Sequence, residues 1–403
     1  MRDRELYARI LGLDEPWAVT EVDLDLDGGQ VVVCLTHRRE APLLCPECGR
    51  ACPGYDAQPR RWRHLDTCQF QTILAADVPR CQCPEHGVKQ VQVPWAAPGS
   101  RFTALFERLA IDWIGAAGRQ ATARRLGLSW DQAGGIMQRA VDRGLARREA
   151  VAVPVLGVDE KSFQGREFVT VVCDLEAGTA LHIADGRGRE SLQECYAAMT
   201  PDQRAGVAAV AMDMHQPYVA ATQAALPDAT IVFDKFHVAK LAGDAVDRVR
   251  RQEAQALAAS GGDRLKGTRY SWLRNPLTES ARQRREAAAL RASHLKTARA
   301  WALKEELMDL FRYAQAARAR RCFQRWYAWA ARSRLRPMVR LAHTLRARLE
   351  LLLNYCRWPI TNAVSEALNS TIQWIKYTAR GFRSREGFRR AIYFHCGGLQ
   401  LYP

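Results

Sequence analysis

The chain has 403 residues, 48% of them hydrophobic, which is enough for two or three domains with a sizeable core. Its formal net charge of +16 indicates a polyanionic partner, either nucleic acid or an acidic membrane surface, although a merely soluble basic protein is the plain alternative. No signal-peptide core follows the start and no uncharged apolar run is long enough to span a bilayer, so we expect a cytoplasmic protein without a membrane partner.

The first part of the chain predicts a β-rich domain, which we place at residues 1–98. Residues 19–27 and 31–36 alternate in polarity around a Gly-Gly pair, which is typical of a β-hairpin. Residues 69–78 predict another strand. Prolines and a glycine at 94–99 then indicate a linker.

Seven of the twelve cysteines precede residue 84, and two matching motifs stand out among them. Each has a ligand, two residues, a second ligand and a glycine: Cys45, Cys48 and Gly49 in the first, Cys83, His86 and Gly87 in the second. In a reducing compartment such cysteines bind metal more often than they form disulfides. Two knuckles supply the closed tetrahedral set of a structural zinc site. Cys81 is an alternative ligand to Cys83 or His86, and Cys52 and Cys68 are poorer candidates.

Two short helices with a break between them are predicted at residues 119–126 and 130–143. This layout is typical of a helix-turn-helix, whose second helix lies in the major groove of DNA, although any helical hairpin has the same pattern. We place this domain at residues 99–150. The candidate DNA-contacting residues on the two helices are Arg119, Arg124, Arg125, Gln132, Gln138, Arg139 and Arg143.

From residue 151 the pattern becomes mixed α/β. Strands are predicted at 151–159, 167–174, 179–184, 207–212 and 230–233, with helices at 190–199, 218–225 and from 235. From about 239 to 353 no strand is predicted, and the abundance of Ala, Leu and Arg indicates an all-helical block. A last helix is predicted at 362–379, with Thr361 or Asn362 as its N-cap and Gly381 just beyond its end.

Residues 318–348 of the helical block are especially rich in arginine, with Trp326, Tyr327 and Trp329 between the arginines. A solvated helix face above core aromatics explains this composition as well as a face that lies along DNA phosphates. The same two explanations hold for Lys376, Arg380 and Arg383, which either hold phosphates or form a solvated basic helix end.

Three carboxylates occupy positions suited to a shared site. Asp159 and Asp213 each end an apolar strand, and Glu366 lies in the first turns of the last helix, close to Asn369. Two divalent ions held by such acids activate the attacking oxygen and stabilise the leaving oxygen of a phosphodiester. Because Mg²⁺ prefers carboxylate oxygens and water, the three acids predict a site for two Mg²⁺ or Mn²⁺ ions.

Asp234 and His237 directly follow the strand that ends at Phe233. Either Asp234 caps the next helix and His237 is a partly buried side chain, or the two contact DNA or support the metal site.

Taken in order, these motifs resemble the ISL3 family of insertion-sequence transposases over nearly the whole chain. The paired knuckles resemble the zinc-binding domain of that family, and residues 119–143 resemble its helix-turn-helix. Its catalytic blocks and tail are matched at residues 157–161, 212–214, 233–237, 364–369 and 375–383. The chain departs from the family pattern at His86, where cysteine is usual, and at Ala367, where glycine is frequent.

The resemblance implies a multidomain α/β plus α chain with a ribonuclease-H-like catalytic domain at residues 151–403, interrupted by helices at about 240–355. It implies that Asp159, Asp213 and Glu366 form an Asp-Asp-Glu triad, and that Asp234 and His237 match a D-x-x-H signature. Such an enzyme binds the terminal inverted repeats of its element, cuts double-stranded DNA there and joins the ends to target DNA.

Synapsis of two ends implies a homodimer or a larger assembly, associated with the nucleoid. A catalytically inactive DNA-binding regulator and a metal-dependent nuclease without strand transfer are the alternatives.

Overall fold

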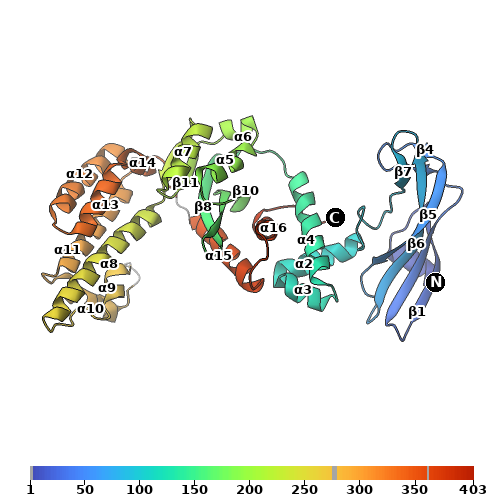
Figure 1. Cartoon of the computed structure of the whole chain (residues 1–403), viewed down its shortest axis with the longest axis horizontal. Coiled ribbons are helices and arrows are strands. Elements are labelled where there is room, and N and C mark those ends of the chain that lie inside the picture. Colours follow the sequence, from blue (N-terminus) through green and yellow to red (C-terminus); the bar gives the residue numbers. More distant parts are fainter. Residues whose placement is uncertain (1–2, 275–278, 361–362) are drawn as a thin grey trace. The chain divides into compact units, whose positions relative to one another are not determined.

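The computed structural model describes residues 3–274, 279–360 and 363–403 (Figure 1). Its internal contacts divide the chain into two compact units. The first unit comprises Met1–Arg148, Ile375–Gly381 and Tyr393–Pro403, and the second comprises Glu149–Trp374 and Phe382–Ile392. Within the described ranges, no helix combines the length and apolar character that crossing a membrane requires.

The first unit begins with α1 (Asp3–Ile10) and a five-stranded sheet. Its strands are β1 (Trp17–Asp25), β2 (Gln30–His37), β5 (Gly54–Arg63), β6 (Gln71–Cys83) and β7 (Gly87–Gln90). They follow the order β1-β2-β6-β5, with β7 paired to β6. The predicted hairpin is confirmed, since β1 and β2 pair antiparallel, and β6 overlaps the strand predicted at 69–78 but begins two residues later and ends five residues later. Two short strands, β3 (Leu43–Leu44) and β4 (Ala51–Cys52), pair antiparallel beside this sheet.

Strand β5 is not evident in the sequence. Only Trp62 of its ten residues is buried, so the strand shows no apolar alternation. Pro59 also lies within it, and this is tolerated because β5 is at the edge of the sheet. Trp62 contacts Trp95 edge-to-face at 5.4 Å, and Trp95 contacts Trp17 at 4.8 Å. These three rings anchor the hydrophobic core of the sheet.

Three helices complete the first unit: α2 (Ala104–Ala117), α3 (Arg119–Arg125) and α4 (Trp130–Ala146). The last two coincide with the predicted helix-turn-helix. The turn contains Gly127 at a φ of 62°, a conformation that glycine adopts without strain. Ser129 then caps α4 by accepting from the Gln132 amide, and the Gln132 side chain accepts from the Ser129 amide in return.

The second unit is built on a sheet of order β10-β9-β8-β11-β12. The strands are β8 (Val155–Gln164), β9 (Glu167–Asp174), β10 (Thr179–Asp185), β11 (Ala209–Met212) and β12 (Thr230–Phe233), and the helices between them are α5 (Arg189–Ala197), α6 (Pro201–Ala205) and α7 (Gln216–Ala225). The pairs β10–β9 and β9–β8 are antiparallel, whereas β8–β11 and β11–β12 are parallel. The mixed α/β prediction is therefore confirmed.

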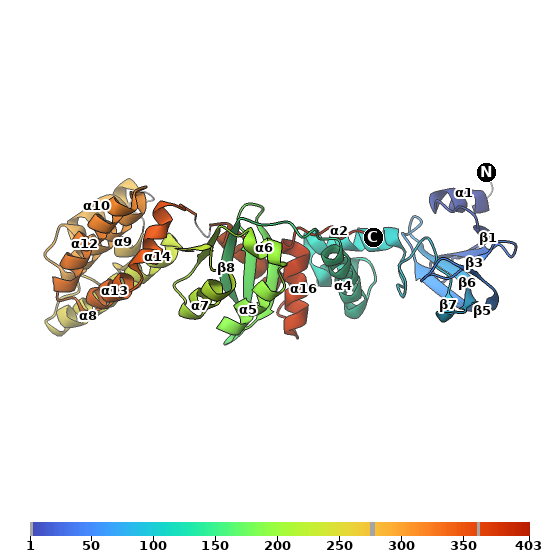
Figure 2. The same cartoon turned by 90° about the horizontal axis from the view of Figure 1, so that it is seen from above.

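An all-helical block follows β12 and belongs to the second unit (Figures 1 and 2). It consists of α8 (Lys235–Ala259), α9 (Arg269–Leu273), α10 (Ala281–Arg291), α11 (Lys296–Met308), α12 (Ala316–Arg332), α13 (Arg336–Arg346) and α14 (Leu349–Leu353), with short 3-10 turns after α11 and α14. As predicted, the described part of this stretch contains no strand. Helix α8 runs from the sheet into the block and contacts α11 and α13.

Two helices end the chain: α15 (Ala363–Thr378) and α16 (Arg385–Cys396). The prediction that α15 is the last helix is wrong. Phe388, Ala391 and Ile392 are buried at a spacing of three and four residues, but this apolar stripe is short and Gly387 interrupts the first turn. Gly381, at a φ of 100°, follows α15 as predicted. The predicted caps Thr361 and Asn362 lie outside the described residues.

Gly157 on β8 permits the close approach of α15. A Cβ atom at this position would lie 2.8 Å from both Ser365 Oγ and Cys173 Sγ, and 2.7 Å from a methyl carbon of Leu175. Such separations are far below van der Waals contact, so a side chain here would push α15 away from the sheet.

We therefore expect Gly157→Ala to lower the free energy of unfolding by about 1–3 kcal/mol, the usual cost of overpacking a close-packed site. Denaturant unfolding measures this change. Gly243→Ala in α8 is the matched control, because its Cβ would meet only Leu273 at 3.6 Å. A Gly157→Ala variant as stable as the Gly243→Ala variant would contradict the tight packing of α15.

Candidate functional site

The parallel strands place three aspartates at one edge of the sheet. Ala211 pairs with Gly157 and Met212 pairs with Phe233. The residues that follow in register are therefore Asp159 beside Asp213, and Asp213 beside Asp234. The prediction that Asp159 ends its strand is wrong, because β8 continues to Gln164 through its pairing with β9. Carboxyl ends of neighbouring parallel strands are where open α/β sheets commonly build their sites.

Asp159, Asp213 and Glu160 form a compact acidic cluster. Each offers a carboxylate oxygen, and these oxygens all lie within 4.8 Å of one another. Burial raises the pKa of Glu160, and the neighbouring charges of Asp213 and Asp159 raise it further. An all-oxygen donor set with excess negative charge fits a hard divalent cation.

Glu366 lies at the same hollow but outside this cluster. It comes from the first turn of α15, is exposed, and lines a hollow of about 370 Å³ together with the cluster. The three predicted ligands therefore line one hollow, whereas Glu160 was not predicted as a ligand. The signal available was its position directly after Asp159.

Asn369 joins α15 to the acidic cluster. Its side-chain nitrogen donates to Asp159 Oδ2 at 2.6 Å, and Lys161 Nζ lies 3.4 Å from the same oxygen. Asn369 is one helical turn after Glu366, so one face of α15 carries both side chains. The orientation of Asp159 therefore depends on the helix that carries Glu366.

His237 bridges two of the aspartates. Its Nδ1 lies 2.6 Å from Asp213 Oδ1 and 3.1 Å from Asp234 Oδ2. Burial alone would lower the pKa of His237, but the hydrogen bonds and charges of Asp213 and Asp234 raise it to about 10. The imidazole is therefore protonated at neutral pH and offsets part of the negative charge. Asp234 is buried and also caps α8 by accepting from the Phe236 amide at 3.2 Å.

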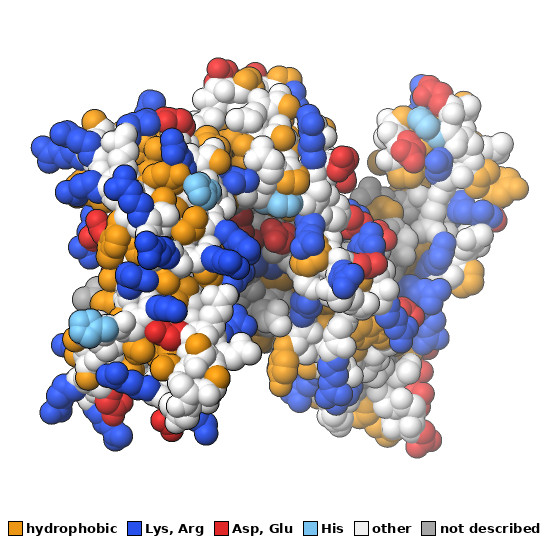
Figure 3. All heavy atoms as spheres, turned by 60° about the vertical axis from the view of Figure 1, so that its left-hand side comes forward, with side chains coloured by type: hydrophobic (Ala, Val, Ile, Leu, Met, Phe, Trp, Pro, Cys, Tyr) orange, Lys and Arg blue, Asp and Glu red, His pale blue; other side chains and the backbone are white. Residues whose placement is uncertain are grey.

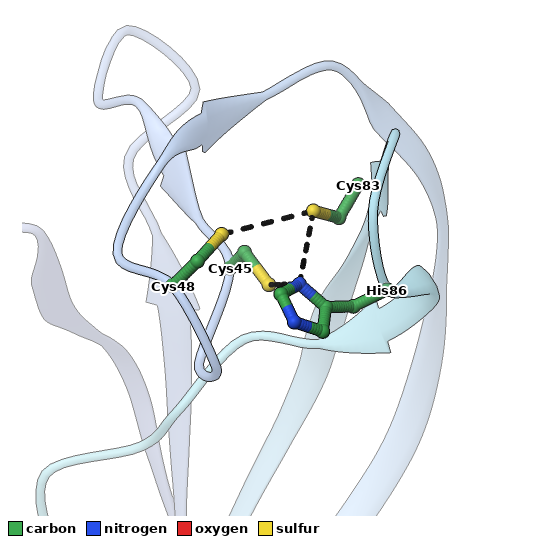
Figure 4. A group of neighbouring side chains, drawn as sticks. All are labelled: Cys45, Cys48, Cys83 and His86. Carbon is green, nitrogen blue, oxygen red and sulfur yellow. Dashed lines mark hydrogen bonds between the residues drawn. The ribbon is translucent and has the colours of Figure 1, made fainter.

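The predicted zinc ligands come together at one end of the first unit's sheet (Figure 4). Cys48 Sγ lies 3.8 Å from Cys83 Sγ, and His86 Nδ1 lies 3.5 Å from Cys83 Sγ and 3.9 Å from Cys45 Sγ. Tetrahedral zinc with ordinary bond lengths places its sulfur and nitrogen ligands about 3.5–3.8 Å apart. The four side chains therefore fit a single zinc ion.

The imidazole of His86 holds the pKa of the Cys83 thiol at about 6, which favours the thiolate that binds metal. Cys81 is buried and packs beside Cys45 and Cys83. Among the described residues, however, the ligand atoms at this site that all lie within 4.8 Å of one another belong to Cys45, Cys48, Cys83 and His86, and this set does not include Cys81.

Several predicted DNA-contacting residues have partners within the first unit. Arg139 donates to the buried carboxylate of Glu107 at 2.6 and 2.8 Å. Arg143 donates to the Leu401 carbonyl at 2.9 and 3.2 Å. An unpaired carboxylate at Glu107 would be costly, so Arg139 has a structural role that the sequence did not reveal.

The remaining candidates on α3 and α4 differ in exposure. The Arg119 guanidinium lies 3.4 Å from the centre of the Trp130 ring, and Arg125 lies 5.5 Å from that of Trp113. Gln132 is used in the cap of α4, Gln138 is half-buried, and Arg124 is exposed. Beyond Glu366, Lys376 is half-buried, whereas Arg380 and Arg383 are exposed.

Comparisons with known proteins decide the family. Residues 156–392 match the transposase model of the ISL3 family, residues 41–86 match the zinc-finger of transposase IS204/IS1001/IS1096/IS1165, and residues 91–141 match the helix-turn-helix domain of transposase family ISL3. The chain belongs to the ISL3 transposase family. It is a DNA transposase with a zinc ribbon and a DNA-binding helix-turn-helix.

Individual relatives match almost end to end. The chain is 27% identical over 419 residues to the transposase for insertion sequence element IS1557 of Mycobacterium tuberculosis, covering 95% of this chain and 93% of that protein. It is also 27% identical over 394 residues to the transposase for insertion sequence element IS1001 of Bordetella parapertussis, covering 96% of this chain and 97% of that protein. The predicted family and the transposase function are thereby confirmed, while the roles of single residues stay predictions.

The zinc ribbon of this transposase yields a direct test of its ligands. We expect Cys83→Ala to lose the bound zinc and to unfold the ribbon, because three ligands leave the tetrahedral set open. Zinc per chain, measured by elemental analysis of the purified protein, gives the result. Cys81→Ala is the matched control and should retain about one zinc ion per chain. If the Cys81→Ala variant lost zinc and the Cys83→Ala variant kept it, Cys81 would be the ligand in place of Cys83.

Proposed function

We propose that this transposase cuts DNA at the ends of its element and joins those ends to target DNA by metal-dependent phosphoryl transfer at Asp159, Asp213 and Glu366. The observation that carries the proposal is the register of β8 and β11, which sets Asp159 and Asp213 side by side at one sheet edge. Glu366 on α15 lines the same hollow.

The sheet supports a ribonuclease-H-like core as the framework of this site. Three antiparallel strands followed by two parallel ones, with Asp159 within β8 and Asp213 directly after β11, agree with the layout that the resemblance implies. On this proposal the catalytic domain spans residues 151–403, and the helices at about 240–355 are an insertion between β12 and α15. The zinc-binding domain at 1–98 and the helix-turn-helix domain at 99–150 precede it.

The acidic cluster would hold two Mg²⁺ or Mn²⁺ ions. When bound, such ions activate the attacking oxygen and stabilise the leaving oxygen of the phosphodiester. Asp159, Asp213 and Glu366 supply the ligands in this proposal, and Glu160 adds a fourth carboxylate within reach of the first two.

Three further side chains orient these ligands. Asn369 holds Asp159 by the 2.6 Å hydrogen bond, and His237 holds Asp213 against the buried Asp234. Partners of this kind fix the direction of a metal-binding carboxylate. We therefore assign Asp234, His237 and Asn369 as positioning residues.

DNA recognition is proposed to use the zinc ribbon and the helix-turn-helix on the terminal inverted repeats. Arg124 is the strongest candidate for a direct contact on α3, because it is exposed, whereas Arg125, which is also exposed, lies 5.5 Å from the centre of the Trp113 ring. Arg380 and Arg383 are proposed to hold phosphates. Bringing two ends together requires at least a homodimer, and target DNA is the second substrate of the assembly.

The first test of this proposal uses Asp213→Asn. We expect the unmodified protein to break DNA at the element boundary with Mg²⁺, and the variant to break none, because removing one charge abolishes the shared metal site. Mapping strand breaks and joined products on DNA that carries both ends gives the result. DNA that is bound but never cut would favour a regulator, and cuts without joined products would favour a nuclease.

Asn369→Ala tests the positioning role. We expect cleavage to fall by about 10–100-fold, the usual effect of losing a residue that orients a metal ligand, and to recover in part at higher Mg²⁺. Cleavage rates across a Mg²⁺ series provide the measurement. Ser370→Ala is the control, because Ser370 is exposed on the same helix and its hydroxyl bonds only the Glu366 carbonyl among described groups. A rate loss in Asn369→Ala that no Mg²⁺ concentration changes would point to a general folding defect instead.

A further inference from the structure

The helical block carries an unusual concentration of one charge. Residues 316–348, which include α12 and α13, contain ten arginines and no Asp or Glu. Figure 3 shows Lys and Arg side chains gathered on this block, which comes forward on the left of that view. Neighbouring like charges on a helix repel one another and destabilise it. A bound polyanion would offset this repulsion.

On α12 the arginines form one stripe. Arg318, Arg321, Arg325 and Arg332 follow one another at intervals of three, four and seven residues, which keeps them on one face of a helix. All four are exposed. The buried residues of α12 define a different face, made up of Ala319, Cys322, Phe323, Trp326 and Ala330.

Tryptophans divide between these two faces. Trp326 is fully buried, and its indole nitrogen donates to the Leu303 carbonyl at 2.7 Å, so it belongs to the core of the block. Trp329 lies within the arginine stripe and is 39% exposed. The core explanation of the aromatic residues therefore accounts for Trp326 but not for Trp329.

The guanidinium groups of the stripe are available for a partner. Across the described residues, no ion pair or side-chain hydrogen bond engages Arg318, Arg321, Arg325 or Arg332. Other arginines of the segment are engaged: Arg320 pairs with Glu350 at 2.6 Å, and Arg346 lies 4.7 Å from the centre of the Tyr327 ring.

We infer that the α12 stripe, defined as Arg318, Arg321, Arg325, Trp329 and Arg332, is a binding surface for the phosphate backbone of duplex DNA. The stripe is about 21 Å long at the rise of an α-helix, which is enough to reach phosphates on both sides of a major groove about 12 Å wide. This inference rests on the proposed function, because α8 links the block directly to the acidic site and both belong to one compact unit. The surface would hold DNA that enters that site.

The test counts phosphate contacts through their salt dependence. The Asp213→Asn protein, which does not cut, is titrated with a labelled duplex that carries one element end and its flanking DNA, over a series of NaCl concentrations. The same protein with Arg318, Arg321 and Arg325 changed to Gln is compared with it. We expect the slope of log Kd against log salt to fall by about 2.7, since each lost phosphate contact removes about 0.9.

Two matched variants make the result specific. Changing Arg282, Arg284 and Arg285 of α10 to Gln removes the same charge from another exposed part of the block, and should leave the slope unchanged. Changing Arg318, Arg321 and Arg325 to Lys keeps the charge and should largely restore the slope. A smaller slope for the α12 Gln variant than for the α10 Gln variant, together with restoration by Lys, would support the inference.

The inference is overturned if both Gln variants have the parental slope, if both lose the same amount, or if the Lys variant behaves like the Gln variant. In any of these cases an unmodified protein that cuts element ends with Mg²⁺ leaves the proposed function intact. An unmodified protein that neither binds nor cuts DNA overturns both.

Discussion

Parallel hydrogen bonding among β8, β11 and β12 is the constraint on which the candidate active site depends. Because Gly157, Ala211 and Val232 are level with one another in the sheet, Asp159 within β8 is level with the residues that directly follow β11 and β12. Acids placed just beyond those positions must then lie side by side. All residues of β11 and three of the four residues of β12 are buried, so a slip by one residue would exchange the side chains that pack on the two faces of the sheet.

The acids gathered there repel one another, and the structure offsets the repulsion with specific partners. The charged His237 forms ion pairs with both Asp213 and Asp234. Lys161 forms an ion pair with Asp159, and Asn369 donates a hydrogen bond to it. Across the described residues no ion pair or hydrogen bond engages the Glu160 carboxylate, and its raised pKa reflects burial and the neighbouring acids. A site with this balance gains by binding cations, which agrees with the phosphoryl-transfer chemistry proposed for the transposase.

Stability in the first unit has a different origin. A small sheet with an exposed edge strand is supported by its three tryptophans and by a zinc site that ties the loop after β3 to the end of β6. The C-terminal segment adds to this unit, since Arg143, Arg147 and Arg148 of the α4 region donate to the carbonyls of Leu401, Tyr402 and Gly397. Positive charge on a DNA-binding domain is therefore partly structural, and net charge alone overstates the number of side chains free to contact DNA.

The sequence by itself determined the features that depend on local spacing or on apolar patterns: the β1–β2 hairpin, the two zinc knuckles, the α3–α4 turn, the order of the α/β elements and the position of Asp213 at a strand end. Tertiary structure alone decided what depends on neighbours distant in the chain. Glu160 lies in the acidic cluster, and Asn369 donates a hydrogen bond to Asp159, 210 residues away in the chain. Arg139 donates to the buried carboxylate of Glu107. The local sequence around an arginine or a carboxylate is the same whether its side chain contacts solvent, a metal ion or a buried partner. The packing of residues distant in the chain decides which of these it contacts.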